Sequence, residues 1–302
     1  MKFKPMLLSN DEYDLKQLNF RDFYMSKKRD GVRIELMADG VYNRSLKRIP
    51  NINIQNKFKD ICDNLSEGFI IEGEIWSPNL PCRIIAGICN SDDKEVPDDL
   101  NVYAFDMVDL NNLQTFAVKR TTYLYDFIKD CSNLGNIKFI SQLEAESYED
   151  VMKFFDDTIK GGFEGVVLRN KLKPYKCSRV TVKSTFGYKI KPSREDDLEI
   201  IGVTERLINT NESMTNELGR SYKRNTKENK ASTGIAATFI VKLENGSECG
   251  VTITGTEEER KKIWENKEKY IGKIAIVKSM DFGVLNKLRH PRLIRVKEKI
   301  EY

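Results

Sequence analysis

The chain has 302 residues, more than one ordinary domain needs, and a formal net charge of only +4 although 32% of its residues are charged. This balance excludes a global basic field for nucleic acid, so any such partner must be held by local patches. The six cysteines form no CxxC pair and His290 is the only histidine, which argues against zinc clusters and excludes multi-histidine metal sites.

Cysteine spacing and hydropathy also bear on location. Scattered cysteines are typical of reduced thiols in a cytosol-like compartment. No apolar run approaches the roughly 20 residues that a membrane span needs. We therefore expect a cytoplasmic protein, in a bacterial or an infected cell, with no membrane partner.

The first two thirds of the chain mix predicted strands with helices. A helix is predicted from Ser147, which can cap it with Asp150 three residues on, to the pair Gly161-Gly162. Because strands and helices follow no regular β-α alternation, we expect an α+β fold. Alternating apolar runs predict strands at 32–36, 69–76, 101–109, 163–169 and 186–191.

The last third of the chain differs from the rest in composition and hydropathy pattern. Proline and dense charge at 191–197 predict a linker, and a long polar stretch at 209–233 lacks an apolar period. Several short strands with one helix are typical of a small β-barrel of the OB kind. Its predicted parts are a strand at 198–207, a hairpin at 238–255 turning at Asn245-Gly246, a helix from 256 with a Thr256/Glu259 capping box, and strands at 273–279 and 292–299.

The stretch "KKRDGVR" (27–33) has two interpretations. It can be a basic β-turn, with Gly31 supplying the turn's backbone angles. It can also hold a nucleophilic lysine, although freeing an amine of pKa about 10.4 near neutral pH costs about 4–5 kcal/mol. Neighbouring cations such as Lys27 and Arg29, or a bound metal ion, would lower that cost.

The same stretch resembles the K-x-D-G-x-R motif of the covalent nucleotidyltransferases, which comprise ATP-dependent DNA ligases, RNA ligases and mRNA capping enzymes. In that motif the nucleophile stands two residues before the aspartate. The resemblance therefore implies that Lys28 is the catalytic lysine, with Asp30 and Arg33 completing the pattern and contacting DNA, and with Arg33 also contacting the nucleotide.

Further motifs of this family follow in order along the chain. "NRSLKRIPN" places Arg44 to contact nucleotide and DNA, and "VYAFD" places Phe105 to stack on the purine. "EGE" and "EGVVLR" supply Glu74 and Glu164, which the resemblance implies for the nucleotide and for Mg²⁺ or Mn²⁺. Gly73 and Gly165 beside them are expected to allow close approach of a ligand.

Basic residues complete the series. In "YKIK", Lys189 and Lys191 point to one face of a strand and can flank a phosphate. Before them the chain has Cys-Ser-Arg where relatives often have Gly-Arg-Ser, and Arg179 takes the arginine's place. "RHPRLIRVK" resembles the motif that orients the pyrophosphate leaving group, which implies a catalytic role for Arg289 and then for Arg295.

The resemblance is to the minimal DNA ligases of large DNA viruses and phages. It implies an ATP-grasp-like nucleotidyltransferase (adenylation) domain at 1–192 and an OB-fold domain at 193–302 with a latch-like insertion at about 207–233. ATP would be the co-substrate, and a monomer would clamp nicked duplex DNA during replication, repair or recombination. The insertion's cations Arg220, Lys223, Arg224 and Lys227 would bind DNA phosphates.

Three other functions remain open on the sequence alone. An RNA ligase shares most of the motifs, although the OB-like last third argues against the common classes. A capping guanylyltransferase also has an OB domain and would use GTP, but the latch-like insertion would then lack a purpose. A non-enzymatic OB-fold binder of single strands would leave the first 190 residues unexplained.

Overall fold

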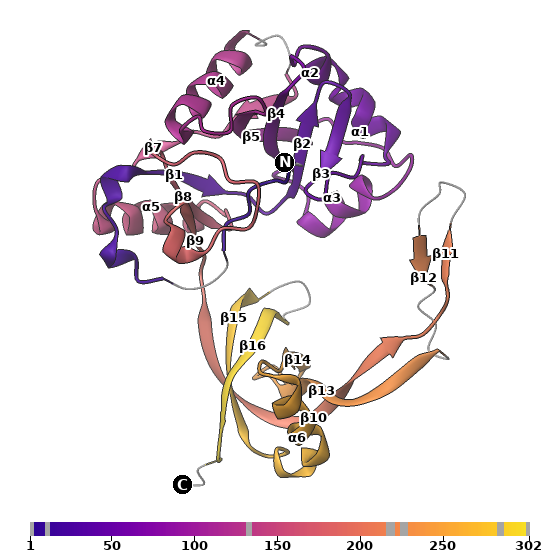
Figure 1. The fold of residues 1–302 in the computed structure, drawn as a ribbon. Helices are drawn as coiled ribbons and strands as arrows, with labels where there is room; N and C mark the ends of the chain where they lie inside the picture. Colours follow the sequence, from indigo (N-terminus) through magenta and orange to yellow (C-terminus); the bar gives the residue numbers. More distant parts are fainter. Residues whose placement is uncertain are drawn as a thin grey trace. The chain divides into compact units, whose positions relative to one another are not determined.

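The chain divides into two compact units, Met1–Lys191 and Pro192–Tyr302 (Figure 1). The structure is a computed structural model that describes residues 3–9, 13–130, 135–215, 221–223, 229–282 and 287–299. None of the helices in these ranges is long and apolar enough to cross a membrane.

A five-stranded sheet and four helices form the larger core of the first unit. The strand order is β3-β2-β4-β5-β6, antiparallel except for the β5–β6 pair. The core buries Ile34 and Ile71 of the sheet against Ile54, Ile85 and other helical side chains. The elements are β2 (Val32–Met37), β3 (Gly40–Asn43), β4 (Phe69–Trp76), β5 (Asn101–Asp109), β6 (Ile137–Phe139), α1 (Ile52–Lys57), α2 (Lys59–Asp63), α3 (Cys82–Cys89) and α4 (Ala117–Asp130).

A second sheet, of order β7-β1-β8-β9, carries one long helix. Its elements are β1 (Phe23–Lys28), β7 (Leu143–Glu144), β8 (Gly165–Asn170), β9 (Gly187–Ile190) and α5 (Tyr148–Lys160), with 3-10 turns at Leu15–Gln17, Phe20–Asp22 and Val182–Ser184. The predicted α5 is confirmed: the Ser147 hydroxyl accepts from the Asp150 N–H at 3.0 Å, and the helix ends at Gly161. The prediction of a mixed α and β fold is also confirmed.

The second unit is built on a closed five-stranded barrel of order β10-β13-β14-β16-β15. Its elements are β10 (Arg194–Asn209), β13 (Lys230–Lys242), β14 (Glu248–Thr252), β15 (Ile274–Phe282), β16 (Leu288–Lys297), α6 (Glu257–Glu265) and a 3-10 turn at Lys267–Lys269. Both halves of the Thr256/Glu259 capping box form, and Gly246 has φ 78° in the predicted hairpin turn. These two local predictions are confirmed.

The linker predicted at 191–197 is wrong for most of its length. Residues 194–197 begin β10 and pair with β15, from Arg194 opposite Ser279 to Asp197 opposite Ile276. Backbone pairing needs no apolar side chains, so a charged stretch can form the first residues of a barrel strand.

The polar stretch at 209–233 also contains strands. β10 and β13 stay paired out to Asn209 opposite Lys230, and beyond them β11 (Ser213–Thr215) pairs with β12 (Ser221–Lys223). Figure 1 shows this ribbon extending away from the barrel of its own unit. A two-stranded ribbon with both faces exposed has no buried face, so it produces no apolar period in the sequence.

Candidate active site

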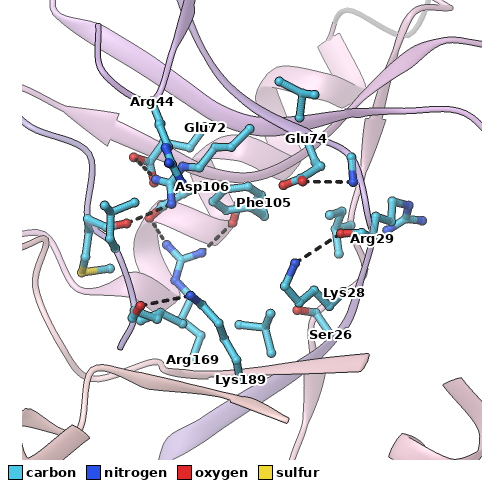
Figure 2. A pocket seen from close by; sticks show the side chains of 18 of the residues that line it. Ser26, Lys28, Arg29, Arg44, Glu72, Glu74, Phe105, Asp106, Arg169 and Lys189 are labelled. Atoms are coloured by element: carbon cyan, nitrogen blue, oxygen red, sulfur yellow. Dashed lines mark hydrogen bonds and ion pairs between the residues drawn. The ribbon is translucent and has the colours of Figure 1, made fainter. Parts of the chain in front are cut away.

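A cavity of about 830 Å³ opens in the first unit, between its two sheets. Its wall brings together eight residues that the sequence assigned to a site: Lys28, Arg33, Arg44, Glu74, Phe105, Arg179, Lys189 and Lys191. Figure 2 shows several of these side chains around the open space. Cations outnumber carboxylates on this wall, as a polyphosphate ligand requires.

Lys28 ends β1 and is held by Glu164. The register of β1 and β8 sets Lys28 opposite Gly165, and the Glu164 N–H donates to the Lys28 carbonyl at 2.9 Å. The Lys28 Nζ then lies 2.5 Å from Glu164 Oε2, while Lys191 Nζ lies 2.5 Å from the other carboxylate oxygen. Burial alone would raise the pKa of Glu164, but the two ammonium groups outweigh it and lower that pKa, so the carboxylate stays ionised.

Glu74 lies on β4, opposite Arg33 on one side and Tyr103 on the other. Its Oε1 accepts from the Gly31 N–H at 3.2 Å. Burial raises the pKa of Glu74, and Glu164 adds to this, while Lys28 and Arg33 oppose it. Lys28 lowers the pKa of both Glu74 and Glu164, so its amine lies within electrostatic reach of both carboxyl groups.

The glycines beside these groups leave room for backbone rather than for a ligand. A Cβ at Gly165 would lie 2.1 Å from the Ile190 carbonyl oxygen, and one at Gly73 would lie 3.1 Å from the Tyr103 carbonyl oxygen. Gly31 is similar, with the Ile75 carbonyl oxygen 2.3 Å away, and its φ is not positive. The expectation of special turn angles at Gly31 was therefore wrong, and backbone of the neighbouring strands accounts for the lack of a side chain at Gly73 and Gly165.

Arg33 makes its contacts within the protein. Its Nη2 pairs with Glu72 at 2.7 Å, its Nε with Glu35 at 3.2 Å, and its Nη1 donates to the Met6 carbonyl at 2.9 Å. Its guanidinium carbon also lies 5.3 Å from the centre of the Phe105 ring. Arg33 therefore supports the predicted purine platform, while its contacts with nucleotide and DNA stay predictions.

Lys189 has an unusual environment for an amine. Its Nζ donates to the Leu8 carbonyl at 3.0 Å. Burial, followed by the charges of Lys28, Lys191 and other nearby cations, lowers the pKa of Lys189 to about 8. A phosphate placed among these cations would relieve their repulsion.

Arg44, Arg179 and Asp30 lie on loops. Arg44 follows β3 in a turn, and Arg179 bridges to Leu7, with its Nη1 donating to the Leu8 carbonyl at 3.3 Å. Asp30 lies in the turn between β1 and β2 but not on the cavity wall. Their assigned roles stay predictions.

The cations of Lys27 and Arg29 each lie against an aromatic ring. Lys27 Nζ lies 4.9 Å from the Phe163 ring centre, and Arg29 packs on Tyr103. The influence of these two cations on the Lys28 amine stays a prediction. Lys191, which shares Glu164 with Lys28, is the cation joined to it.

A buried ionic network that the sequence did not predict lies next to Phe105. Asp106 is 1% exposed and pairs with Arg120 at 2.9 Å and with Arg169. Arg169 and Gln142 also donate to the Phe105 carbonyl, at 2.5 and 2.8 Å. Asp106 and Arg169 stand inside quoted motifs, so charged residues within buried strands were the available signal.

The remaining predicted residues belong to the second unit. Arg289 and Arg295 lie on β16, opposite Met280 and Ile276 of β15, and Lys223 is exposed on β12. Arg220, Arg224 and Lys227 lie outside the described residues.

The Lys28–Glu164 pair lies beside a cation-lined cavity whose wall also holds Glu74 and Phe105, an arrangement that suits nucleotidyl transfer. Residues 5–191 match the family model described as "ATP dependent DNA ligase domain". This match covers more than half of the chain, so the chain belongs to the ATP-dependent DNA ligase domain family.

Individual relatives are distant. The chain is similar to the DNA ligase of African swine fever virus, strain Badajoz 1971 Vero-adapted, with 25% identity over 190 residues, which are 61% of this chain and 45% of the viral protein. The ligase of isolate Tick/Malawi/Lil 20-1/1983 gives 25% over 184 residues, 59% and 43% of the two chains. The chain thus spans about half the length of these curated relatives.

Two solved structures resemble the fold over nearly the whole chain. One, described as "DNA binding with a minimal scaffold: Structure-function analysis of Lig E DNA ligases", has a TM-score of 0.72 and 18% identity, covering 96% of this chain and 98% of that one. Chlorella virus DNA ligase-adenylate has a TM-score of 0.55 and 20% identity, covering 97% and 99%. At these identities the likeness concerns the fold alone.

Proposed function

We propose that this protein is an ATP-dependent DNA ligase that joins a 5′-phosphate to a 3′-hydroxyl at a nick in duplex DNA. The observation that carries the proposal is the Lys28 amine, paired at 2.5 Å with Glu164 on the wall of a cation-lined cavity that also holds Phe105. The match of residues 5–191 to the ligase family supports the same conclusion.

Three displacements at phosphorus make up the reaction. The Lys28 amine, after losing a proton, attacks the α-phosphorus of ATP: a P–N bond forms, and the bond to pyrophosphate breaks. The nick's 5′-phosphate oxygen then takes the AMP and releases the lysine, and the 3′-hydroxyl finally displaces AMP and loses its proton. Catalysis of such steps is mainly positioning and charge neutralisation. We assign phosphate contacts to Lys189 and Lys191, and purine stacking to Phe105.

Glu74 and Glu164 fit a divalent ion that also binds phosphate. Within the described ranges, no group of three or more histidine, cysteine, aspartate or glutamate side chains is placed to hold a metal. Mg²⁺ commonly takes one or two carboxylates together with waters and substrate phosphates, so two acidic groups beside the cavity suffice. When bound, the ion supplies charge neutralisation for the phosphates. Glu164 would then contact the metal ion in place of one of its two ammonium partners, Lys28 or Lys191.

The second unit is assigned to DNA and to the leaving group. Its closed barrel with one helix suits an OB-fold, and the β10–β13 ribbon with β11 and β12 suits a latch that binds duplex DNA. Arg289 and then Arg295 would orient pyrophosphate. Asp30, Arg33 and Arg44 would contact the nick, which one monomer would clamp.

The test is incubation with α-labelled ATP or α-labelled GTP and magnesium, followed by a chase with nicked duplexes. The proposal predicts a labelled protein from ATP, and transfer and sealing on a nick with DNA on both sides. Labelling by GTP alone would indicate a capping guanylyltransferase, and sealing only of RNA strands an RNA ligase. Absence of any labelled protein would overturn the proposal.

A further inference from the structure

The residue after Lys28 carries a guanidinium that is enclosed by aromatic rings. The Arg29 guanidinium carbon lies 4.0 Å from the centre of the Tyr103 ring and 5.4 Å from those of Trp76 and Phe163. The rings also contact one another, with Trp76 edge-on to Tyr103 at 5.3 Å and stacked on Phe163 at 6.0 Å. We call these three rings the Arg29 cage.

Every ring of the Arg29 cage stands beside a group of the active site. Phe163 immediately precedes Glu164, and Tyr103 lies directly opposite Glu74 in the β4–β5 ladder. Trp76 follows Glu74 by two residues on β4, which places both on the same face of the sheet. The guanidinium therefore joins the segments that carry Lys28, Glu74 and Glu164.

Aromatic faces, not carboxylates, surround the Arg29 guanidinium. Its Nε and Nη1 atoms are buried and have no hydrogen-bond partner among the described residues. Burial lowers the pKa of Arg29, against the attraction of Tyr103 and Glu74. An arginine stays protonated nonetheless, so its charge is retained by the negative faces of the rings.

The side chains of Lys28 and Arg29 point in different directions. Figure 2 shows Lys28 directed into the cavity and Arg29 directed away from it. Anchoring Arg29 on one side of the chain therefore restricts the direction of Lys28 on the other. The Gly31 N–H bond to Glu74, at 3.2 Å, fixes the far end of the same turn.

We propose that Arg29 is a positioning residue for the first chemical step, because its cation–π anchorage in the cage aims the Lys28 amine at the α-phosphorus. The proposal rests on the ligase function proposed above. It requires a cation at position 29 and the ring of Tyr103, and it assigns Arg29 no contact with ATP. Its effect should therefore fall on the rate of bond formation and not on ATP binding.

The main test is Arg29→Met in the full chain, with the rate of adenylylation followed over a range of ATP concentrations. A misaligned nucleophile should lower the maximal rate by about 10²-fold, while the KM for ATP stays within about threefold of the parent value. Arg29→Lys keeps a cation for the rings and should recover most of the rate. A merely structural role would not give this kcat-specific loss with rescue by lysine.

Lys16→Met is the matched control. The exposed Lys16 Nζ lies 5.5 Å from the Tyr148 ring in the same unit, so this change removes a cation–π contact away from the site. It should leave both kinetic constants unchanged. Sealing of a nick that already bears AMP needs no attack by Lys28, so Arg29→Met should largely retain it.

A double-mutant cycle tests whether Arg29 acts on the adenylylation rate through its contact with the rings of the Arg29 cage. Tyr103→Leu should slow adenylylation in the same kcat-specific way, and adding Arg29→Met should cost little more, because both changes remove one interaction. If a melting curve shows that Arg29→Met does not fold, the adenylylation kinetics of Tyr103→Leu alone still test the proposal. Independent, multiplicative losses would overturn the proposal, as would a parent-like rate for Tyr103→Leu or for Arg29→Met. If the parent itself forms no labelled adduct, the ligase function fails and not the cage alone.

Discussion

At the scale of single residues, two adjacent lysines have different surroundings. Lys28 Nζ pairs with Glu164, while Lys27 Nζ lies over the Phe163 ring. We expect Lys28→Ala to eliminate the labelled protein–AMP adduct, because Lys28 is the amine that the resemblance assigns as nucleophile and it faces the cavity, whereas Lys27→Ala should reduce labelling only modestly. Lys28→Ala should still seal some nicks that already carry 5′-AMP. Peptide mapping that places AMP on Lys27 would contradict this assignment.

Lys189 should make nucleotide binding depend on pH. Its pKa is lowered to about 8 by burial and by the charges of Lys28, Lys191, Arg179 and Arg33, so it loses its proton in the range of ordinary assays. Phosphates favour the ammonium form. ATP affinity should therefore fall as pH rises from about 7 to about 9, and titration calorimetry can measure this. Lys189→Met should bind ATP more weakly, and its ATP affinity should depend less on pH between about 7 and about 9.

The lowered pKa of Lys189 changes protein stability with pH in the opposite direction to ATP affinity. Between about 8 and the ordinary value of 10.5, the unfolded chain binds the proton that folded Lys189 has lost. The contribution of this residue to the free energy of unfolding therefore rises with pH through that window. Chemical denaturation of the parent and of Lys189→Met across the window would measure it, and identical pH profiles would contradict the assignment.

At the scale of elements, the ribbon beyond the barrel offers a separable test. We would join Asn209 to Lys230, the last pair of the β10–β13 ladder, with a short Gly-Ser turn. Adenylylation should stay nearly intact, because no ATP contact is assigned to the removed residues. Binding of nicked DNA should weaken. Its salt dependence should become shallower, by about 0.9 in log–log slope for each DNA phosphate that the protein no longer neutralises.

A charge-only variant is the control for this deletion. Changing Arg220, Lys223, Arg224 and Lys227 to glutamine keeps the length of the insertion and removes its cations. If phosphate contacts are what the ribbon supplies, this variant should show the same shallow salt dependence. If the deletion and the glutamine variant both bound nicked DNA like the parent over a range of salt concentrations, the ribbon would not be a DNA-binding latch.

At the scale of the whole molecule, the first step is assigned residues from both units. Lys28 belongs to the first unit and Arg289 to β16 of the second. A contact to pyrophosphate matters only while pyrophosphate leaves, so Arg289→Ala should slow adenylylation far more than sealing of a pre-adenylylated nick. Lys297→Ala, whose amine pairs with Asp197 within the barrel at 2.5 Å, is the control on the same strand. Equal losses in both assays would refute this role.

The sequence by itself determined the features that depend on neighbouring residues. The alternation at 69–76 and 101–109 predicted β4 and β5 with their observed bounds. The capping box at Thr256 and the turn at Asn245-Gly246 were equally readable, because their hydrogen bonds join residues a few positions apart. The spacing of lysine, aspartate and glycine pointed to Lys28 through its likeness to a known motif.

Only the tertiary structure decided which groups meet. Glu164 reaches Lys28 across 136 positions because β1 pairs with β8, and β1 itself was not predicted. The burial of Asp106 and the enclosure of Arg29 by three rings also join distant segments. Local patterns record the period of one element and the bonds at its ends. Pairing between strands, and the burial that raises or lowers a pKa, depend on partners far along the chain, so no local pattern contains them.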